Sequence, residues 1–221
     1  MALVVSVIGA GRIGRHVIDH VTDAPWLRPG RVLTRTEGPG AFWTTPADII
    51  IDAAGPSALR AHGAACLARA DLWTVSAAAL VDDGFRQDLL DVARNAGTRL
   101  RLFAPWVAGI AEMPAGHATR LDLRISRPGS GAEFTGPLRA AARAFPDELN
   151  FAVAAALCGP GIEATRVEMT DAAPHRLEAT LHAPEGSFRS EMTFSGQGTH
   201  PTALALMGAL DRVQPGLGYG A

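Results

Sequence analysis

Histidine is the side chain best suited to move a proton near neutral pH, and the sequence contains seven of them. His175 is a candidate general acid or base, because it follows Pro174 at the start of an alternating strand pattern in the second half of the chain. Spacing alone leaves open that it is an ordinary exposed histidine. His16 and His20 have the spacing of helical metal ligands, but no acidic partner completes a metal motif. We therefore expect a solvated helix face there and no metal site.

A glycine-rich loop follows the N-terminal hydrophobic stretch, with Gly9, Gly11 and Gly14 in the spacing G-x-G-x-x-G. Gly9 allows a tight turn, Gly11 lets a pyrophosphate approach the backbone, and Gly14 lets a helix pack closely on the strand. The N–H groups and positive dipole end of that helix face the diphosphate. We expect a dinucleotide to bind here, with Arg12 and Ile13 in the same loop; a purely structural turn is the alternative.

The residues around position 35 favour NADP over NAD. NAD-selective enzymes usually carry Asp or Glu about twenty residues beyond the glycines. This chain instead has Arg35 between Thr34 and Thr36, with no acid before Glu37. A guanidinium suits a 2′-phosphate through charge-assisted hydrogen bonds. NAD remains the second choice, and a solvated surface role for Arg35 remains the alternative.

Small residues follow the next two predicted strands, where ligands of doubly wound sheets bind. Ala54 lies just after the third strand, and Ser76 and Ala78 just after the fourth, so we expect all three to contact the cofactor. Asp52 ends the third strand and either faces the nucleotide or caps the following helix. Ser76 is not a predicted nucleophile, because no histidine and acid are placed recognisably around it.

The composition excludes several classes of function. The chain has no lysine, so Schiff-base and Walker-type phosphate chemistry are ruled out. A net charge of −2 provides no basic surplus for nucleic acid or a membrane surface, and the apolar runs are too short to span a bilayer. Cys66 and Cys158 lie far apart in apolar helical patterns and are predicted to be buried rather than disulfide-bonded or metal-bound. A cytoplasmic enzyme is the expectation.

Strand and helix patterns alternate through the first half, which predicts an α/β fold with a Rossmann-type doubly wound parallel sheet. Pro25 and Pro29 are expected to break the chain before the second strand, and 37–45 is expected to be a loop. The predicted strands are 3–8, 31–34, 48–52, 72–76 and 99–103, and the helices are 12–21, 56–70 and 83–96.

The pattern changes after Pro105, where alternating stretches predict an α+β region with a mostly antiparallel sheet. The predicted strands are 121–125, 164–170, 176–182 and 187–194, and the helices are 137–144, 148–157 and 201–213.

Several segments together resemble the L-aspartate dehydrogenase family. F-P-D-E-L-N-F-A at 145–152 is similar to that family's F-P-x-N-x-N-x-A, and H-R-L-E-A at 175–179 to its H-x-I-E-A. H-P-T at 200–202 is similar to N-P-x-T before the last helix. I-D-A-A at 51–54 and S-A-A-A-L at 76–80 stand where the family has V-E-x-A and S-V-G-A-L.

The resemblance implies a dinucleotide-binding domain over 1–107, closed by the C-terminal helix within 201–221, and a substrate and dimerisation domain over 108–200. It implies a homodimer that transfers a hydride between NADP (or NAD) and the Cα of an amino acid or imine, with aspartate and iminosuccinate as the expected pair. His175 inherits the catalytic role and Asn150 a place in the active site. His175 would relay a proton or activate the water that hydrolyses the imine.

Several departures from the family bear on the site. Trp106 and Val107 replace small residues after the fifth strand, Ala78 replaces a glycine, and Glu148 replaces the first asparagine of the motif. A dicarboxylate needs cationic or amide donors, and no arginine is singled out by the motifs. A reductase acting on a different imine is therefore an alternative, as is a non-catalytic nucleotide-binding protein. A cysteine-dependent semialdehyde dehydrogenase built on Cys158 is a weaker alternative, because that residue lies in an apolar helical run.

Overall fold

A computed structural model describes residues 2–36, 40–103, 107–110, 113–114 and 116–213. The described residues form two compact units. The first lies within Met1–Phe103 and Thr199–Gly218, and the second within Ala104–Gly198. Within the described residues, no helix is long and apolar enough to cross a membrane.

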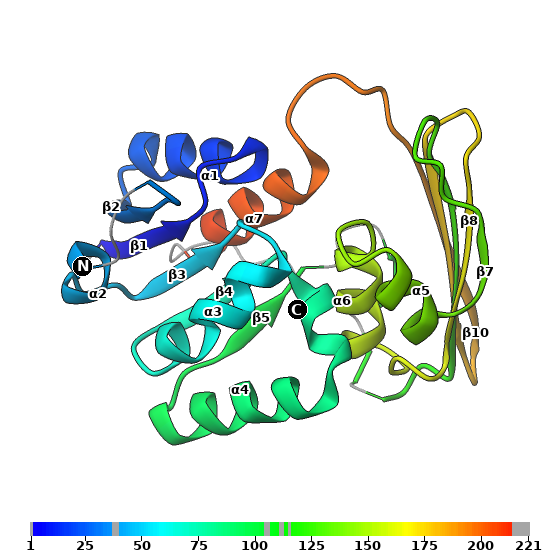
Figure 1. Cartoon of the computed structure of the whole chain (residues 1–221), viewed down its shortest axis with the longest axis horizontal. Helices are drawn as coiled ribbons and strands as arrows, with labels where there is room; N and C mark the ends of the chain where they lie inside the picture. The colour runs from blue at the N-terminus through cyan, green and yellow to red at the C-terminus, as the bar shows by residue number, and fades with distance from the viewer. Residues whose placement is uncertain (1, 37–39, 104–106, 111–112, 115, 214–221) are drawn as a thin grey trace. The chain divides into compact units, whose positions relative to one another are not determined.

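The first unit is built on a parallel five-stranded sheet in the order β2-β1-β3-β4-β5 (Figure 1). Because β2 and β3 pair with opposite edges of β1, the chain reverses its direction of winding beside β1, and ligands bind at the carboxyl ends of such strands. The strands are β1 Leu3–Ile8, β2 Leu27–Leu33, β3 Ile49–Asp52, β4 Asp71–Thr74 and β5 Leu100–Leu102.

Helices cover both faces of this sheet, as the doubly wound prediction requires. One face packs against α1 Arg12–Asp23 and α7 Pro201–Asp211, whose buried side chains share a core cluster with β1 and β3. The C-terminal helix therefore completes the unit that the N-terminal strand begins. The remaining helices are α2 Gly40–Thr44, α3 Pro56–Leu67 and α4 Asp83–Ala96, and a 3₁₀ helix, η1, spans Ala77–Val81.

Two local predictions in this unit were wrong. Pro29 does not precede the second strand but lies inside β2, which tolerates it because β2 is an edge strand and need not donate every ladder hydrogen bond. The predicted loop 37–45 contains the one-turn helix α2; Glu37 itself lies outside the described residues.

The second unit is a mixed five-stranded sheet in the order β10-β9-β6-β8-β7. Three neighbouring pairs are antiparallel and only β6 and β8 run parallel, so the prediction of a mostly antiparallel sheet is confirmed. β7 was missed because its sequence F-T-G-P does not alternate. The strands are β6 Arg120–Ser126, β7 Phe134–Pro137, β8 Thr165–Thr170, β9 Arg176–Ala183 and β10 Gly186–Thr193.

One face of this sheet is covered by α5 Leu138–Ala144 and α6 Asn150–Cys158 (Figure 1). The alternation of the strands explains the layering: Leu121, Leu123 and Ile125 of β6 are buried, while Arg120 and Arg124 on the alternate positions are exposed. The other face is therefore polar, and it carries the charged side chains described below.

Candidate functional site

The loop after β1 has the close packing that the glycine spacing predicts. Gly9 has a φ of +92°, which favours glycine, and a Cβ there would lie 2.9 Å from the Cβ of Ala54, just after β3. A Cβ at Gly14 would lie 1.9 Å from the carbonyl oxygen of Gly9, so α1 starts directly against the turn. The two loops on either side of the winding reversal thus meet at Gly9 and Ala54.

The N-terminus of α1 fits an anionic group. Gly11 is the N-cap residue and makes no side-chain cap, and no acidic residue lies in the first turn. A Cβ at Gly11 would meet nothing within 4 Å, so the backbone there is open to a ligand. Arg12 is exposed beside it, and Ile13 is half-buried against the core. These features suit a pyrophosphate at a helix N-terminus.

A buried polar network supports the loop after β3. The Asp52 carboxylate is 1 % exposed, accepts a hydrogen bond from Thr74 Oγ1 at 2.7 Å, and accepts another from the Ala54 N–H at 3.1 Å. Ser76 hydrogen-bonds to Asp52 and accepts from the Gly55 N–H at 3.1 Å. Burial raises the pKa of Asp52, and the hydrogen bonds from Ser76 and Thr74 partly offset this.

This network excludes the expectation that Asp52 caps the following helix. Gly55 is the N-cap of α3 and has no side-chain cap, so Asp52 does not cap that helix. Ser76 is also completely buried, and Ala78 is buried within η1. Ser76 therefore fixes the backbone of the loop after β3, whereas Ala54 is exposed at its surface.

Arg35 lies just beyond β2 at the same end of the sheet and is exposed. Its neighbours Thr34 and Thr36 share a hydrogen bond of 3.1 Å between their hydroxyl oxygens. Arg35 makes no hydrogen bond or ion pair with another described residue. Its guanidinium is therefore available to an external anion.

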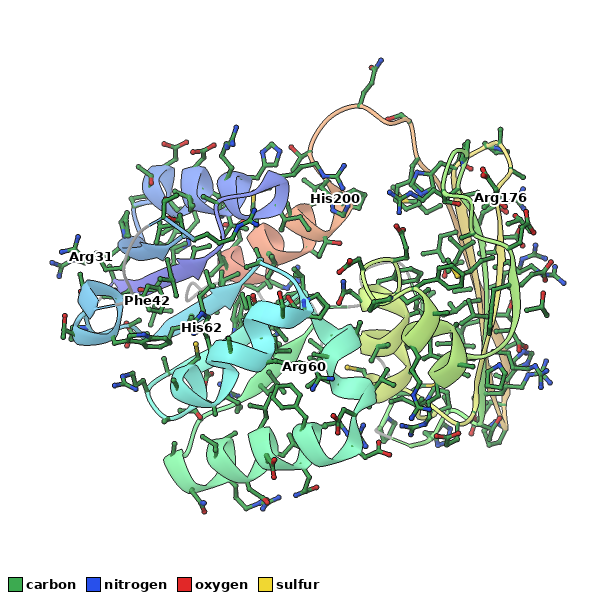
Figure 2. All side chains as sticks on the ribbon, in the orientation of Figure 1. Arg31, Phe42, Arg60, His62, Arg176 and His200 are labelled. Atoms are coloured by element: carbon green, nitrogen blue, oxygen red, sulfur yellow. The ribbon has the colours of Figure 1, made fainter. Side chains whose placement is uncertain are left out.

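His175 lies at one end of the second sheet, and the strand register shows what surrounds it. Ser126 of β6 and Thr193 of β10 both pair with Arg176 of β9. β9 runs antiparallel to both neighbours, so the residue before Arg176 lies beside the residues after Ser126 and Thr193. Arg127, His175 and Phe194 therefore lie side by side. The Phe194 N–H donates to the His175 carbonyl at 2.9 Å, which continues the pairing of β9 with β10, and the Arg127 N–H donates to the Thr170 carbonyl at 3.0 Å, which continues the pairing of β6 with β8. Arg176 marks this end of the sheet in Figure 2.

The alternation of the strands also indicates which face these side chains share. Arg127 is two residues beyond the buried Ile125, and His175 is two residues before the buried Leu177. Side chains two apart on a strand point to the same face. Both residues thus continue the face that α5 and α6 cover, away from Arg176 on the opposite face.

The environment of His175 favours the neutral imidazole. Its ring stacks on the Phe194 ring with centroids 4.3 Å apart. Partial burial lowers the pKa of His175, and the positive charge of Arg127 lowers it further. A neutral imidazole can accept a proton from water or from a substrate ammonium group near neutral pH.

Arg127 also connects His175 to the segment before α6. Its guanidinium forms an ion pair with the Glu148 carboxylate. Two residues later, Asn150 is the first residue of α6, and its side-chain amide donates to the Asp147 carbonyl at 3.4 Å. Arg127 thus brings the two predicted active-site segments, around 150 and around 175, to one place. Sequence reasoning missed Arg127, because only the pairing of β6 with β9 shows that it faces His175.

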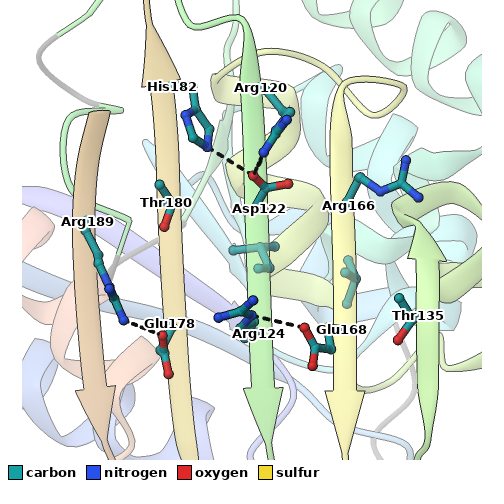
Figure 3. A pocket seen from close by; sticks show the side chains of 12 residues that line it. Arg120, Asp122, Arg124, Thr135, Arg166, Glu168, Glu178, Thr180, His182 and Arg189 are labelled. Atoms are coloured by element: carbon teal, nitrogen blue, oxygen red, sulfur yellow. Dashed lines mark hydrogen bonds and ion pairs between the residues drawn. The ribbon is translucent and has the colours of Figure 1, made fainter. Parts of the chain in front are cut away.

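The opposite face of the second sheet carries a separate pocket of about 400 Å³ (Figure 3). Most of its charged side chains pair with one another: Arg120 with Asp122, Arg124 with Glu168, and Arg189 with Glu178. The Nε2–H of His182 donates to the Asp122 carboxylate at 3.0 Å. Trp106 and Glu112, which belong to the altered family motif, lie outside the described residues, and Val107 is buried.

The remaining sequence candidates have structural roles. His20 hydrogen-bonds to Asp211 at 2.9 Å and so links α1 to α7 rather than lying on a purely solvated face. Cys66 is buried, and burial raises the pKa of its thiol to about 12. Cys158 is only partly buried, and burial raises its pKa as well. Neither thiol is poised to act as a thiolate nucleophile.

Comparison with known proteins now defines the family. Residues 114–212 match the model of the aspartate dehydrogenase C-terminal domain, and residues 26–102 match that of the homoserine dehydrogenase NAD-binding domain. An L-aspartate dehydrogenase of Ruegeria pomeroyi is 35% identical over 93% of this chain and 90% of its own length. The chain belongs to the L-aspartate dehydrogenase family. An L-aspartate dehydrogenase 2 of Bordetella pertussis is 31% identical over 82% of this chain and 78% of its own length.

Solved structures agree on the fold. The aspartate dehydrogenase of Thermotoga maritima superposes with a TM-score of 0.78 at 16% identity and covers 100% of both chains. A hyperthermophilic archaeal homoserine dehydrogenase in complex with NADPH gives a TM-score of 0.62 at 10% identity, over 96% of this chain and 97% of that one. In this aspartate dehydrogenase family member, the glycine loop and the NAD-binding domain match indicate an NAD(P)-dependent oxidoreductase.

Proposed function

We propose that this protein is an NADP-dependent aspartate dehydrogenase. In this proposal it interconverts L-aspartate with oxaloacetate and ammonia by hydride transfer at Cα, through iminosuccinate. The single observation that carries the proposal is the cluster of His175, Arg127 and Glu148 beside Asn150, in a chain whose curated relatives are named L-aspartate dehydrogenases. Nucleotide binding is assigned to 1–107 with 201–221, and substrate binding to 108–200.

The residues of the first unit would hold the cofactor, which supplies the hydride acceptor or donor when bound. Gly9, Gly11 and Gly14 form a turn open to a pyrophosphate, with Arg12 and Ile13 at the start of α1. Ala54 and, behind it, Ser76 and Ala78 would shape the loops near the nicotinamide. Arg35 would bind the 2′-phosphate, which is the basis for preferring NADP.

The residues of the second unit would handle the proton and the imine. Oxidation at Cα leaves an iminium, and its hydrolysis to an oxo acid and ammonia requires a water to lose a proton. The neutral His175 imidazole can accept that proton, and in the reductive direction the imidazolium returns it. Asn150 would orient substrate or water through its side-chain amide.

A turnover assay tests this proposal directly. Purified protein is mixed with NADPH, oxaloacetate and ammonium, and nicotinamide absorbance is followed. We expect absorbance to fall only when all three are present, and to rise when L-aspartate is supplied with NADP⁺. Turnover of other oxo acids but not oxaloacetate would support the alternative imine reductase. Cofactor binding with no turnover on any oxo acid would overturn the enzymatic proposal in favour of a nucleotide-binding protein.

We also propose a homodimer that works in the cytoplasm. The polar face of the second sheet is the contact surface, because arginines and carboxylates alternate across its strands and two copies related by a two-fold axis can pair them reciprocally. Light scattering should give twice the mass of one chain, and the charge reversal Arg124→Glu should lower it. A wild-type mass of a single chain would contradict the dimer.

A further inference from the structure

We infer that Glu148 is a specificity-determining residue: its carboxylate occupies the guanidinium of Arg127 and competes there with a carboxylate of the substrate. The inference rests on the proposed function for the identity of the substrate. It goes further in assigning Arg127 as the cation that receives the substrate, and Glu148 as an internal competitor for it.

The position of Arg127 supports the first half of this assignment. Arg127 follows β6 opposite His175, and its backbone is fixed by the hydrogen bond from its N–H to the Thr170 carbonyl. A substrate whose reacting carbon lies near the imidazole has a carboxylate within reach of the neighbouring strand. An arginine is the side chain that binds a carboxylate through two parallel hydrogen bonds.

The ion pair with Glu148 supports the second half. A carboxylate is already bound to Arg127, and it comes from the segment directly before α6, where the family motif has asparagine. The Arg127 side chain is 47% exposed and the Glu148 side chain 33% exposed. An ion pair at such exposure contributes little to stability, so a substrate carboxylate can displace Glu148. An asparagine could not compete in this way, because it carries no charge.

The other charged groups around His175 are already engaged. Asp171, which follows β8, accepts hydrogen bonds from the Gly129 and Gly131 N–H groups at 2.6 and 2.8 Å. Arg176 pairs with Glu178 and Glu191 on the opposite face of the sheet. Phe194, which follows β10, contributes an uncharged ring. Among the described charged groups, Arg127 is therefore the one that acts on the His175 imidazole, and Glu148 is its ion-pair partner.

Two substitutions should act in opposite directions. Glu148→Gln frees Arg127, so the KM for oxaloacetate should fall by about two- to fivefold, the size expected when a partly exposed ion pair is removed. Arg127→Gln should raise that KM by roughly tenfold or more, because a charge-assisted contact is lost. The affinity for NADPH should change in neither variant. Glu163→Gln is the matched control, since Glu163 pairs with Arg139 elsewhere in the same unit.

The titration of His175 is an independent readout that a purely structural role would not move in this way. Glu148→Gln leaves the charge of Arg127 uncompensated, so the His175 pKa should fall further; Arg127→Gln removes that charge, so the pKa should rise. Both are measured from the imidazole proton resonance by NMR, together with the affinity for succinate as an unreactive dicarboxylate.

The outcomes separate this inference from the proposed function. If the wild type turns over oxaloacetate but Glu148→Gln matches Glu163→Gln in KM, succinate affinity and His175 titration, the inference is overturned. If the wild type does not turn over oxaloacetate, the proposed function fails. Succinate affinity and the His175 titration then still decide the inference, which stands only if the two variants shift both quantities in opposite directions.

Discussion

The carboxyl ends of the strands in the first unit differ in kind from the His175 end of the sheet in the second. In the first, shape and backbone dominate: Gly14 packs against the Gly9 carbonyl, and the Asp52 carboxylate beneath the loops is buried and hydrogen-bonded. In the second, partly exposed side chains dominate, and Arg127 pairs with Glu148 beside His175.

This difference separates two ways of building a binding site. A pyrophosphate is recognised by backbone N–H groups at a helix N-terminus, so its site depends on glycines that keep side chains away. A reacting carbon needs groups that carry charge and exchange protons, so its site depends on side chains brought together by strand register. Substitutions in the first site should therefore act through geometry, and those in the second through charge.

The largest effect should come from Gly14→Ala. The new Cβ would lie 1.9 Å from the Gly9 carbonyl oxygen, a backbone atom that cannot turn away. We expect the free energy of unfolding to fall by about 3 kcal/mol, as for severe overpacking, together with loss of NADPH binding. Thermal unfolding and a fluorescence titration with NADPH measure the two effects.

Gly11→Ala is the matched control, because a Cβ there meets nothing within 4 Å and its φ of −75° suits alanine. Its stability should fall by no more than about 1 kcal/mol, the cost of replacing glycine by alanine at an N-cap, while its NADPH affinity should fall if the pyrophosphate approaches this backbone. A Gly11→Ala variant as unstable as Gly14→Ala, or a Gly14→Ala variant as stable as the wild type, would contradict the distinction between packing and binding in this loop.

The next largest effect should come from His175→Asn. Loss of the general acid and base should lower kcat by about 10² to 10⁴-fold while leaving NADPH affinity unchanged. Steady-state kinetics with oxaloacetate and ammonium measure it. His117→Asn, which removes an imidazole paired with Glu185 at 2.9 Å in the same unit, should retain activity. A His175→Asn variant with kcat close to that of His117→Asn would exclude His175 from proton transfer.

The same comparison explains how much the sequence could predict. The glycine spacing and the alternation of strands and helices predict the parallel sheet, and α4 begins and ends at the predicted residues Asp83 and Ala96. These are local signals, since periodicity and helix caps act within a few residues. The position of Pro29 inside β2 was not predictable in this way, because only the sheet order shows that β2 is an edge strand.

The substrate side shows the limit more clearly. Asn150 and His175 were found through family motifs, whereas Arg127 was not, since it belongs to no motif and meets His175 only through the pairing of β6 with β9. Asp52 shows the same limit: its partners Thr74 and Ser76 come from the neighbouring strand and its end. Contacts between distant parts of the chain depend on register, which periodicity does not specify.

A smaller effect is expected for Arg35→Ser, which tests the preference for NADP. The affinity for NADPH should fall by about 10- to 100-fold, as for loss of a hydrogen bond to a charged group, and that for NADH should not change. Isothermal titration with both nucleotides measures it. Arg28→Ser, also an exposed arginine of this edge of the sheet, serves as the control. Equal losses for NADPH and NADH would show that Arg35 does not contact the 2′-phosphate.

The smallest effect should be the pH dependence that Asp52 confers on stability. Because burial raises its pKa in the folded protein, the folded state holds a proton that the unfolded state has already released. The contribution of Asp52 to stability must therefore decline as the pH rises above the ordinary aspartate pKa of ~3.9 and through the raised folded value.

Asp52→Asn cannot ionise, so the stability of the wild type relative to this variant should decrease from acidic to neutral pH. Melting temperatures across that range measure the difference, with Asp19→Asn, an exposed carboxylate of α1, as the control. If the stability of the wild type relative to Asp52→Asn instead increased with pH, the hydrogen bonds from Thr74 and Ser76 would outweigh burial in setting the Asp52 pKa. Charge as well as geometry would then govern the loop after β3.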